Sequence, residues 1–424
     1  MTLILSSSVA FVATVLLIFL LRPVAHLTGL VDIPIQRSSH LRATPLVGGL
    51  AIYIAVLATY LLLMELRGVP LNRVVQSYFL GAGLLVLVGI IDDYIRLSSL
   101  LRFIAQIIAS LVMIYGGNVV ITDIGAVSFS GDVIYLGWLS VPFTVFATLG
   151  IINALNMSDG LDGLSGSLAL ISLIGLMIGA VLAAPTVNVI LILLLAASVL
   201  GFLMFNLRIF RREQASIFMG DAGSMLLGFS ITWFAITLTQ GMNRTIAPAT
   251  ALWFLMLPIF DTVAMIFRRL VRRRSPFAPD REHIHHVLLM AGFRVNEAVA
   301  IMSAAALIGV GIGVLSTDLR VPEFSVAGLF VVFGLLYMWM ILRAWKVMKF
   351  IERSIDRRES KTDRRSDVER RLVNDPGHTG LERRFGKERR VISRRVDIKA
   401  VTPASEVQTK ISETGVLNVG PRND

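Results

Sequence analysis

The chain has 424 residues, of which 55% are hydrophobic and 16% are charged, and its mean hydropathy is +0.74. Long uncharged runs recur along it, which excludes an ordinary soluble domain. The absence of cysteine excludes disulfides, thiolate metal ligands and cysteine nucleophiles. The formal net charge of +11 is unevenly distributed, because residues 346–424 hold 20 Lys and Arg against 13 Asp and Glu.

The apolar runs predict eleven transmembrane helices, each close to the length that crosses the hydrocarbon core of a bilayer. In chain order they are 3–22, 47–65, 76–91, 102–116, 138–155, 165–183, 187–205, 222–240, 249–267, 297–315 and 324–342. The predicted fold class is therefore an all-α polytopic membrane protein. Short connections and the lack of an internal repeat predict one integral membrane domain over residues 1–345.

The distribution of basic residues predicts the orientation of these helices. No Lys or Arg precedes the first span and Arg22 follows it directly, so the N-terminus is expected outside. Alternating from there, the cytoplasmic loops hold 15 Lys and Arg and the outer loops hold 4. The C-terminus is then cytoplasmic. The outer segment 117–136 predicts either a hairpin of two short strands, at 119–121 and 133–135, or an irregular loop.

An acidic pair, Asp92 and Asp93, ends the third predicted span. Adjacent carboxylates at a helix end repel each other and lose hydration, a cost that a divalent cation or a proton relieves. The alternative interpretation is that they only terminate the helix at the lipid headgroups. A pair of this kind is a weak signal taken alone.

A second polar group ends the fifth predicted span. Asn153 and Asn156 are three residues apart and share a helix face, and Asp159 and Asp162 follow within about three turns. The glycines between them allow tight turns and close approach of a phosphate, although Asn-Asp-Gly clusters also make plain turns. In a third patch, Asp221 opens the eighth span, where it is either a helix N-cap or a ligand for a metal or substrate.

The segment 275–286 is polar and rich in histidine in a mostly apolar chain. It follows a run of arginines that begins at Arg268, and it contains Arg281, His283, His285 and His286. Arginine and histidine supply hydrogen-bond donors for phosphate oxygens. A zinc site and ordinary loop histidines are the alternatives.

All of these patches fall at the cytoplasmic side in one predicted topology. Carboxylate and amide oxygens suit Mg²⁺ or Mn²⁺, which bridge to substrate phosphates. The pattern therefore predicts phosphoryl transfer at the membrane surface. A transporter is the rival class, but transport sites lie near the bilayer midplane, whereas these carboxylates lie at span ends.

The motifs together resemble one family, the polyprenyl-phosphate N-acetylhexosamine-1-phosphate transferases, over roughly residues 20–350. The resemblance rests on Thr44-Pro-Leu-Val-Gly-Gly49, Asp92-Asp93, Asn153-Ala-Leu-Asn-Met-Ser-Asp-Gly-Leu-Asp-Gly-Leu164, Phe218-Met-Gly-Asp-Ala-Gly-Ser224 and Ser275-Pro-Phe-Ala-Pro-Asp-Arg-Glu-His-Ile-His-His286. It implies transfer of a sugar-1-phosphate from a UDP-sugar to undecaprenyl phosphate with release of UMP, an initiating step of cell-surface polysaccharide synthesis. It also implies a Mg²⁺ or Mn²⁺ requirement and a bacterial inner-membrane location. The last motif favours N-acetylglucosamine as the sugar, with another N-acetylhexosamine or a 6-deoxy donor as the alternative.

The resemblance also implies roles for single residues. Asp221 and Asp93 correspond to the metal site, and Asp92 to a base or an acceptor-orienting group. The carboxylates expected to take part in catalysis are Asp92, Asp93, Asp159 and Asp162. The residues expected to bind the substrates are Asn153, Asn156, Arg268, Arg281, His283, His285 and His286. Direct attack by the lipid phosphate and a covalent phospho-enzyme both stay open, and direct attack is favoured because that phosphate is largely ionised and needs mainly alignment.

The basic tail, residues 346–424, departs from the family core, and no function is carried over to it. Its repeated acid-Arg-Arg groups fit either a disordered segment or a helix on an anionic membrane surface. Few aromatic residues separate the basic pairs, which disfavours nucleic acid as a partner. The expected partners are the UDP-sugar, undecaprenyl phosphate and the lipid bilayer, and a homodimer is left open.

Overall fold

The computed structural model describes residues 2–33, 43–181, 187–209, 212–241, 244–273 and 283–344. Arg281 and the predicted tail, 346–424, lie outside the described residues. Within the described ranges the one sheet is a pair of two-residue antiparallel strands, β1 (Val31–Asp32) and β2 (Thr44–Pro45). The remaining regular structure is helical, so the prediction of an all-α membrane protein is confirmed.

Ten helices in the described part of the chain are long and apolar enough to cross a membrane. They comprise α1 (Thr2–Thr28), α2 (Gly48–Arg67), α3 (Arg73–Ile95), α4 (Ser99–Leu111) with a π-helical turn (Val112–Gly116), a 3₁₀ turn (Gly137–Leu139) with α5 (Ser140–Ser158), α6 (Leu164–Val181), α7 (Val187–Asn206), α8 (Gly220–Thr239), α12 (Val295–Asp318) and a last helix (Glu323–Ala344). A bent pair, α9 (Pro248–Phe254) and α10 (Met256–Val271), adds an eleventh if it is counted as one span. With the bent pair counted as one span, the predicted number of eleven spans is confirmed.

The bent pair shows that the predicted span 249–267 is broken. Its two helices meet at an angle of 84°. Pro258 in the first turn of α10 has no N–H, so it cannot bond the carbonyl of Phe254 as a continuous helix would require. That carbonyl accepts a hydrogen bond from Ser172 Oγ of α6 instead, at 2.8 Å. The carbonyl that the break leaves without a helical partner is therefore hydrogen-bonded inside the protein, as irregular backbone at membrane depth requires.

Of the two alternatives for the segment 117–136, the structure has the irregular loop, and strands at 119–121 and 133–135 do not form. The segment does turn back on itself, with a single bridge between Asp123 and Tyr135 and a bond from the Ile124 N–H to the Ile134 carbonyl of 3.0 Å. The side chain of Gln240 explains why the pairing stops there. Its Oε1 accepts the N–H groups of Thr122 and Asp123, at 2.9 and 3.2 Å, and so replaces a strand partner.

Helix α8 lies at the centre of the bundle. In the most apolar 18-residue stretch of α8, 94% of the residues are buried inside the protein, whereas the corresponding share for the last helix is 11%. Glycines on two neighbours allow their close approach to its first turn. A Cβ at Gly49 of α2 would lie 2.2 Å from the Gly223 nitrogen, and one at Gly89 of α3 would lie 2.3 Å from the Ala222 Cα. Backbone contact on two sides therefore sets the position of α8.

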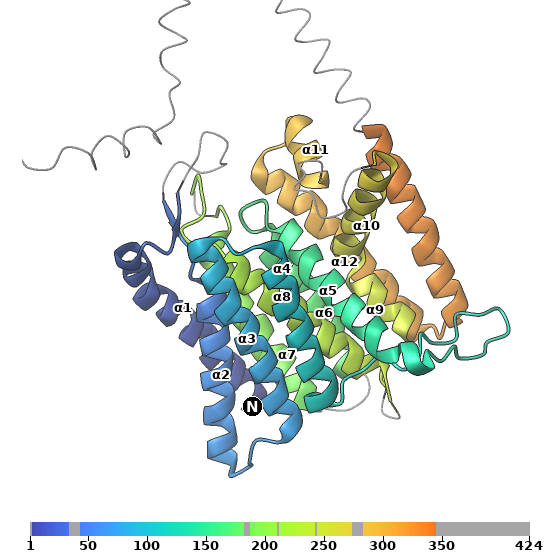
Figure 1. Cartoon of the computed structure of the whole chain (residues 1–424), viewed down its shortest axis with the longest axis horizontal. Helices are drawn as coiled ribbons and strands as arrows, with labels where there is room; N and C mark the ends of the chain where they lie inside the picture. The colour runs from blue at the N-terminus through green and yellow to red at the C-terminus, as the bar shows by residue number, and fades with distance from the viewer. Residues whose placement is uncertain are drawn as a thin grey trace, which may run out of the picture. The chain divides into compact units, whose positions relative to one another are not determined.

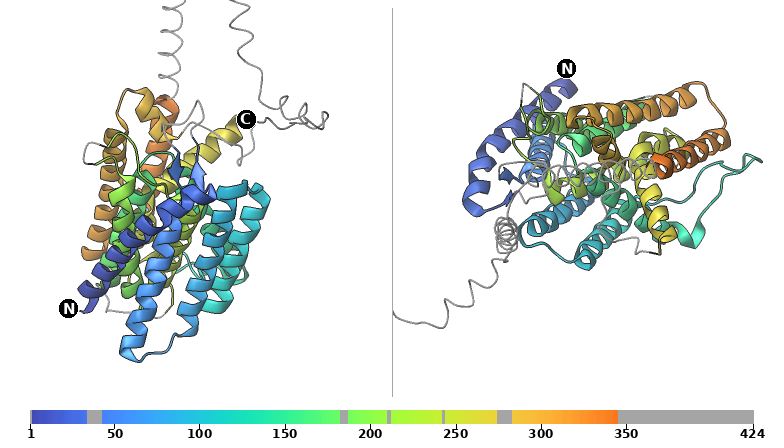
Figure 2. Two further views of the ribbon diagram at one scale, coloured as in Figure 1. Left: turned by 90° about the vertical axis from the view of Figure 1, so that its left-hand side faces the viewer. Right: turned by 90° about the horizontal axis from the view of Figure 1, so that it is seen from above.

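Several chemistry-bearing segments share one end of the bundle (Figure 1). The start of α8, the C-terminal end of α3, the short helix α11 (Ile284–Met290) and the two strands all lie there, at the top of the view. The last helix also ends there, whereas the N-terminus lies at the opposite end, as the side view in Figure 2 shows. The two ends of the described chain are thus on opposite sides of the bundle, as an odd number of crossings requires.

Candidate active site

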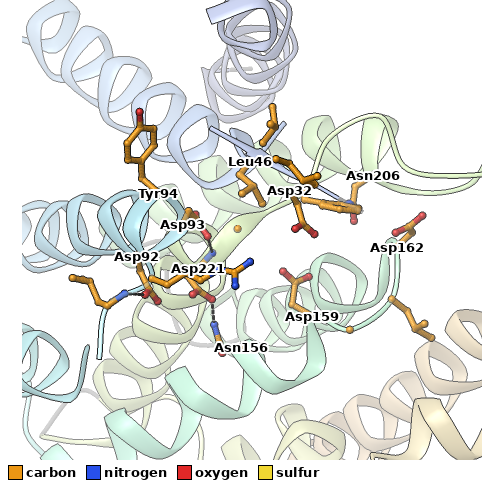
Figure 3. Close-up of a pocket in the computed structure, with 18 of the residues that line it drawn as sticks. Asp32, Leu46, Asp92, Asp93, Tyr94, Asn156, Asp159, Asp162, Asn206 and Asp221 are labelled. Atoms are coloured by element: carbon orange, nitrogen blue, oxygen red, sulfur yellow. Dashed lines mark hydrogen bonds between the residues drawn. The ribbon is translucent and has the colours of Figure 1, made fainter. Parts of the chain in front are cut away.

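A cavity of about 1040 Å³ opens at this end of the bundle. It is lined by carboxylates that are far apart in the sequence (Figure 3). They are Asp32, Asp92, Asp93, Asp159, Asp162 and Asp221, joined by Asn156, Arg96, Arg102 and His286. The carboxylates that the sequence predicted as catalytic are therefore brought together.

Asp93 acts as the cap of α8. Its Oδ1 accepts the N–H of Asp221 at 2.9 Å, and its Oδ2 accepts that of Ala222 at 3.5 Å. These amides belong to the first turn of the helix, where N–H groups have no partner within the helix. The alternative that Asp221 is the N-cap is wrong, because α8 begins at Gly220 and Met219 holds the N-cap position without a side-chain bond. A carboxylate from another helix thus does the capping.

Asp221 is left to face the cavity with other partners. Its Oδ1 accepts the amide of Asn156 at 2.5 Å, and that amide also reaches Ser224 Oγ at 2.9 Å. Its Oδ2 lies 3.5 Å from the guanidinium of Arg102, which is also 3.1 Å from Asp92 Oδ2. One arginine therefore lies between two acidic side chains contributed by α3 and α8.

Asp92 is held rigidly at the wall of this cavity. Its side chain is 4% exposed, and its Oδ1 accepts the Leu97 N–H at 2.6 Å, where the chain turns out of α3. Its Oδ2 is buried and has no hydrogen-bond partner of good geometry, although Arg102 balances its charge. A buried acceptor oxygen of this kind is open to a further ligand.

Asp159 and Asp162 differ although both line the cavity. Asp162 Oδ2 pairs with Arg208 Nε at 2.7 Å and accepts the Ala215 N–H at 2.8 Å, which ties the end of α5 to the loop after α7. Asp159 is half-buried. Burial, together with the negative charges of Asp221 and Asp162, raises the pKa of Asp159 to about 7. Asp159 thus shares a proton or a cation more readily than an ordinary carboxyl does.

The histidines line a second cavity of about 430 Å³ that shares five residues with the first. The shared residues are Arg102, Asn156, Asp159, Gly160 and His286. The ring of His285 packs on the backbone of Gly160, where an added Cβ would lie 2.5 Å from its Nε2. The three histidines at the end of the predicted segment therefore adjoin the predicted acidic cluster.

Of the remaining residues predicted to bind the substrates, Asn153 lines this second cavity. Its side chain donates to Gln106 Oε1 at 2.9 Å. Arg269 is part of its lining, and Arg268, the residue predicted from the sequence, is buried one position earlier. Arg281 lies outside the described residues.

The carboxylate cavity is rich in the oxygen donors that metal sites use. No three His, Asp or Glu side chains in the described residues are arranged to hold an ion as they stand. The chemistry of the cavity nevertheless fits a hard cation, because six carboxylates face two arginines and one histidine. Carboxylate and water oxygens are the usual ligands of Mg²⁺. An anionic phosphate also needs added positive charge to enter so acidic a cavity.

Three site residues were missed by the sequence interpretation: Asp32, Arg102 and Asp261. Asp32 and Arg102 carry no motif signal, because each meets the site only through folding. Asp261 did carry one, since a lone carboxylate inside an apolar span is costly and marks a polar partner. Its Oδ2 lies 2.8 Å from His283 Nδ1.

Comparisons with known proteins agree with this geometry. The family model described as glycosyl transferase family 4 matches residues 75–239. This range contains all six predicted carboxylate and amide positions from Asp92 to Asp162, and also Asp221. The undecaprenyl-phosphate alpha-N-acetylglucosaminyl 1-phosphate transferase of Escherichia coli O157:H7 is 38% identical over 346 residues, covering 81% of this chain and 92% of that protein. The chain belongs to this transferase family. The proteins of the same name from Escherichia coli K12 and Pasteurella multocida are 37% and 35% identical, covering 92% and 96% of their lengths. Because nearly the whole of each relative is matched, the family assignment extends over the membrane domain and not only one motif.

Proposed function

We infer that the chain transfers N-acetylglucosamine 1-phosphate from UDP-N-acetylglucosamine to undecaprenyl phosphate. The products are undecaprenyl-pyrophosphate-N-acetylglucosamine and UMP. The observation that carries this inference is the match to transferases of this name over 92% of their length. The carboxylate cavity and the histidine cavity support it, because a charged nucleotide donor needs both metal-type ligands and phosphate donors within one continuous space.

The bond changes define what the cavity has to do. An oxygen of the lipid phosphate attacks the β-phosphorus of the donor, and the bond from that phosphorus to the bridging oxygen of UMP breaks. UMP leaves with the electron pair of that bond. Little covalent work is needed from the protein, so positioning and neutralisation of charge account for most of the catalysis.

A divalent cation, Mg²⁺ or Mn²⁺, is proposed to bind at Asp93 and Asp221. Such an ion would offset the charge of the donor pyrophosphate. Asp221 is suited to this role by its exposure to the cavity, and Asp93 because it lines the same cavity from α3 and accepts the N–H of Asp221. Asp159, with its raised pKa, lies close enough to feel the charge of Asp221.

Asp92 is proposed to orient the acceptor and not to attack the donor. Its bond to the Leu97 N–H and its ion pair with Arg102 hold it at the cavity wall. A nucleophile would have to leave these partners to reach phosphorus. Direct attack by the lipid phosphate is therefore the mechanism that the geometry favours.

The remaining roles are also proposals. Asn153, Asn156 and the three histidines bind the nucleotide sugar, and Arg268 and Arg281 are assigned to its phosphates. The cavity faces the cytoplasm, where UDP-sugars are made, and residues 1–345 form the catalytic domain with 346–424 as an appended tail. A homodimer is an additional proposal that size measurements in detergent would test.

The assay for the proposed function is release of UMP by purified protein given UDP-N-acetylglucosamine, undecaprenyl phosphate and Mg²⁺. Asp221→Asn is expected to lose about 100-fold or more in kcat, since removing one preorganised electrostatic group commonly has this effect. Asp132→Asn is the matched control, because this exposed aspartate lies in the 117–136 segment away from the cavity. No UMP from the unaltered protein, or full turnover by Asp221→Asn at saturating Mg²⁺, would contradict the proposal.

A further inference from the structure

Asp261 joins three helices beside the histidine cavity. It lies on α10 and is 4% exposed. Its Oδ2 is 2.8 Å from His283 Nδ1, at the start of α11. Its Oδ1 accepts the Ile284 N–H at 3.2 Å and the hydroxyl of Tyr337, on the last helix, at 3.0 Å. These helices lie near one another at the upper right of Figure 1.

The three contacts determine which nitrogen of His283 carries a proton. A carboxylate accepts hydrogen bonds and does not donate them when it is ionised. His283 Nδ1 must therefore be the protonated nitrogen in the neutral ring. The other nitrogen, Nε2, is then the one left for the cavity that His283 lines.

His283 in turn contacts the rest of the histidine group. Its ring is stacked on that of His285, with centroids 5.6 Å apart and planes within 3° of each other. His285 is packed on Gly160, next to Asp159 in the acidic cavity. Burial and the neighbouring histidines lower the pKa of His285 to about 3, so His285 stays neutral and keeps this stacked position without charge repulsion.

We propose that Asp261 is a positioning residue for the transfer reaction, which acts through His283 by fixing its Nδ1–H tautomer and the direction of its Nε2. The proposal rests on the proposed function, since it gives His283 a substrate to face. Asp261 does not line either cavity described above, so its effect on substrate passes through the imidazole. A carboxylate that orients a functional histidine in this way is a recurring arrangement in enzymes.

Asp261→Asn is a specific test because the backbone decides how the amide turns. The Ile284 N–H is a donor that cannot change, so the asparagine carbonyl oxygen must face Ile284 and Tyr337. The asparagine NH₂ then faces His283 Nδ1, which can only accept. The variant therefore imposes the opposite tautomer, with the proton on Nε2, at almost no change in side-chain volume. Tyr337→Phe is the matched control, because it removes a bond to the same carboxylate without altering the histidine.

The first measurement is the ¹⁵N–¹H correlation spectrum of the imidazole rings in protein labelled with ¹⁵N-histidine. The chain has six histidines, so the His283 signal can be assigned by its loss in His283→Gln. We expect a proton on Nδ1 in the unaltered protein and in Tyr337→Phe, and on Nε2 alone in Asp261→Asn. A proton on Nε2 alone in the unaltered protein would overturn the proposal, and this result needs no variant to fold.

The second measurement is a double-mutant cycle on UMP release. Asp261→Asn is expected to lower kcat on the order of 10- to 100-fold, as for other histidines oriented by a carboxylate. It should add little to the loss already caused by His283→Gln, while Tyr337→Phe should stay within about threefold of the unaltered enzyme. Full additivity of Asp261→Asn and His283→Gln would show that Asp261 acts by another route. Failure of the proposed function would give a different result. The unaltered protein would then release no UMP although its spectrum still showed the proton on His283 Nδ1.

Discussion

Asp162 is expected to serve stability more than chemistry, and its ion pair with Arg208 gives the size of the effect. Asp162 Oδ2 and Arg208 Nε are 2.7 Å apart, and their side chains are 3% and 16% exposed. At that distance and an effective dielectric constant of about 20, the attraction is about 6 kcal/mol before desolvation is subtracted. Removing one partner of a buried pair costs about 3–5 kcal/mol, because the other charge loses its counter-ion.

Asp162→Ala should therefore lower the unfolding temperature strongly in detergent. Arg208→Ala together with Asp162→Ala should recover part of that loss, since no buried charge is then left opposite a missing partner. Thiol-reactive dyes cannot be used, because the chain has no cysteine, so tryptophan fluorescence or retention of the monodisperse peak after heating is the readout. Asp132→Ala, at an exposed position, controls for the loss of one negative charge.

The activity of Asp162→Ala should fall in step with the folded fraction. Transfer per folded molecule is expected to stay within about tenfold of the unaltered enzyme, well short of the effect expected for a catalytic group. An unchanged unfolding temperature combined with complete loss of activity would refute the structural role. That outcome would return Asp162 to the catalytic group that the sequence alone suggested.

Three more predictions concern pH, the tail and the donor. The pKa of Asp159 is raised to about 7 in the folded protein, so the stability that its proton contributes is complete below the unfolded pKa of about 3.9 and is lost as pH rises to about 7. Chelator-treated protein should therefore have a lower unfolding temperature at pH 8 than at pH 5.5, and Asp159→Asn should reduce this difference. An equal difference between the two pH values in the variant would contradict the prediction. A chain ending near Phe350 should keep its transfer activity in neutral detergent, and any effect of the tail should appear only in anionic vesicles and weaken with salt, because attraction to the membrane surface is screened within about 8–10 Å. Loss of activity in detergent with folding intact would show that the domain boundary is wrong. Among UDP-sugars, UDP-N-acetylglucosamine should give the highest kcat/KM, and a higher value for another N-acetylhexosamine or a 6-deoxy donor would refute the assignment.

Much of this fold could be predicted from hydropathy, because a span must be both long and uncharged. The break at Leu255 could not, since it depends on two facts: Pro258 removes one hydrogen bond, and Ser172 of another helix replaces it. The hairpin that was one of the two alternatives for the segment 117–136 does not form for a similar reason. Gln240, far away in the sequence, takes the N–H groups that a strand partner would have used.

The candidate site was predictable where its residues occur in dense polar motifs. Asp92, Asp93, Asn156 and Asp221 were found in this way, and they line one cavity. Motifs do not reveal what each carboxylate does. Asp93 caps α8 and Asp162 pairs with an arginine. Both roles depend on contacts between segments that are distant in the sequence, which no local pattern encodes.

The cap formed by Asp93 has a consequence for how the cavity can be observed. The oxygens that accept the Asp221 and Ala222 amide protons belong to a side chain that also lines the cavity. A ligand that draws electron density from this carboxylate weakens those two hydrogen bonds, and one that orders the carboxylate strengthens them. The rate of hydrogen–deuterium exchange at these two amides should therefore show whether a ligand is bound in the cavity. The measurement needs neither a label nor turnover of substrate.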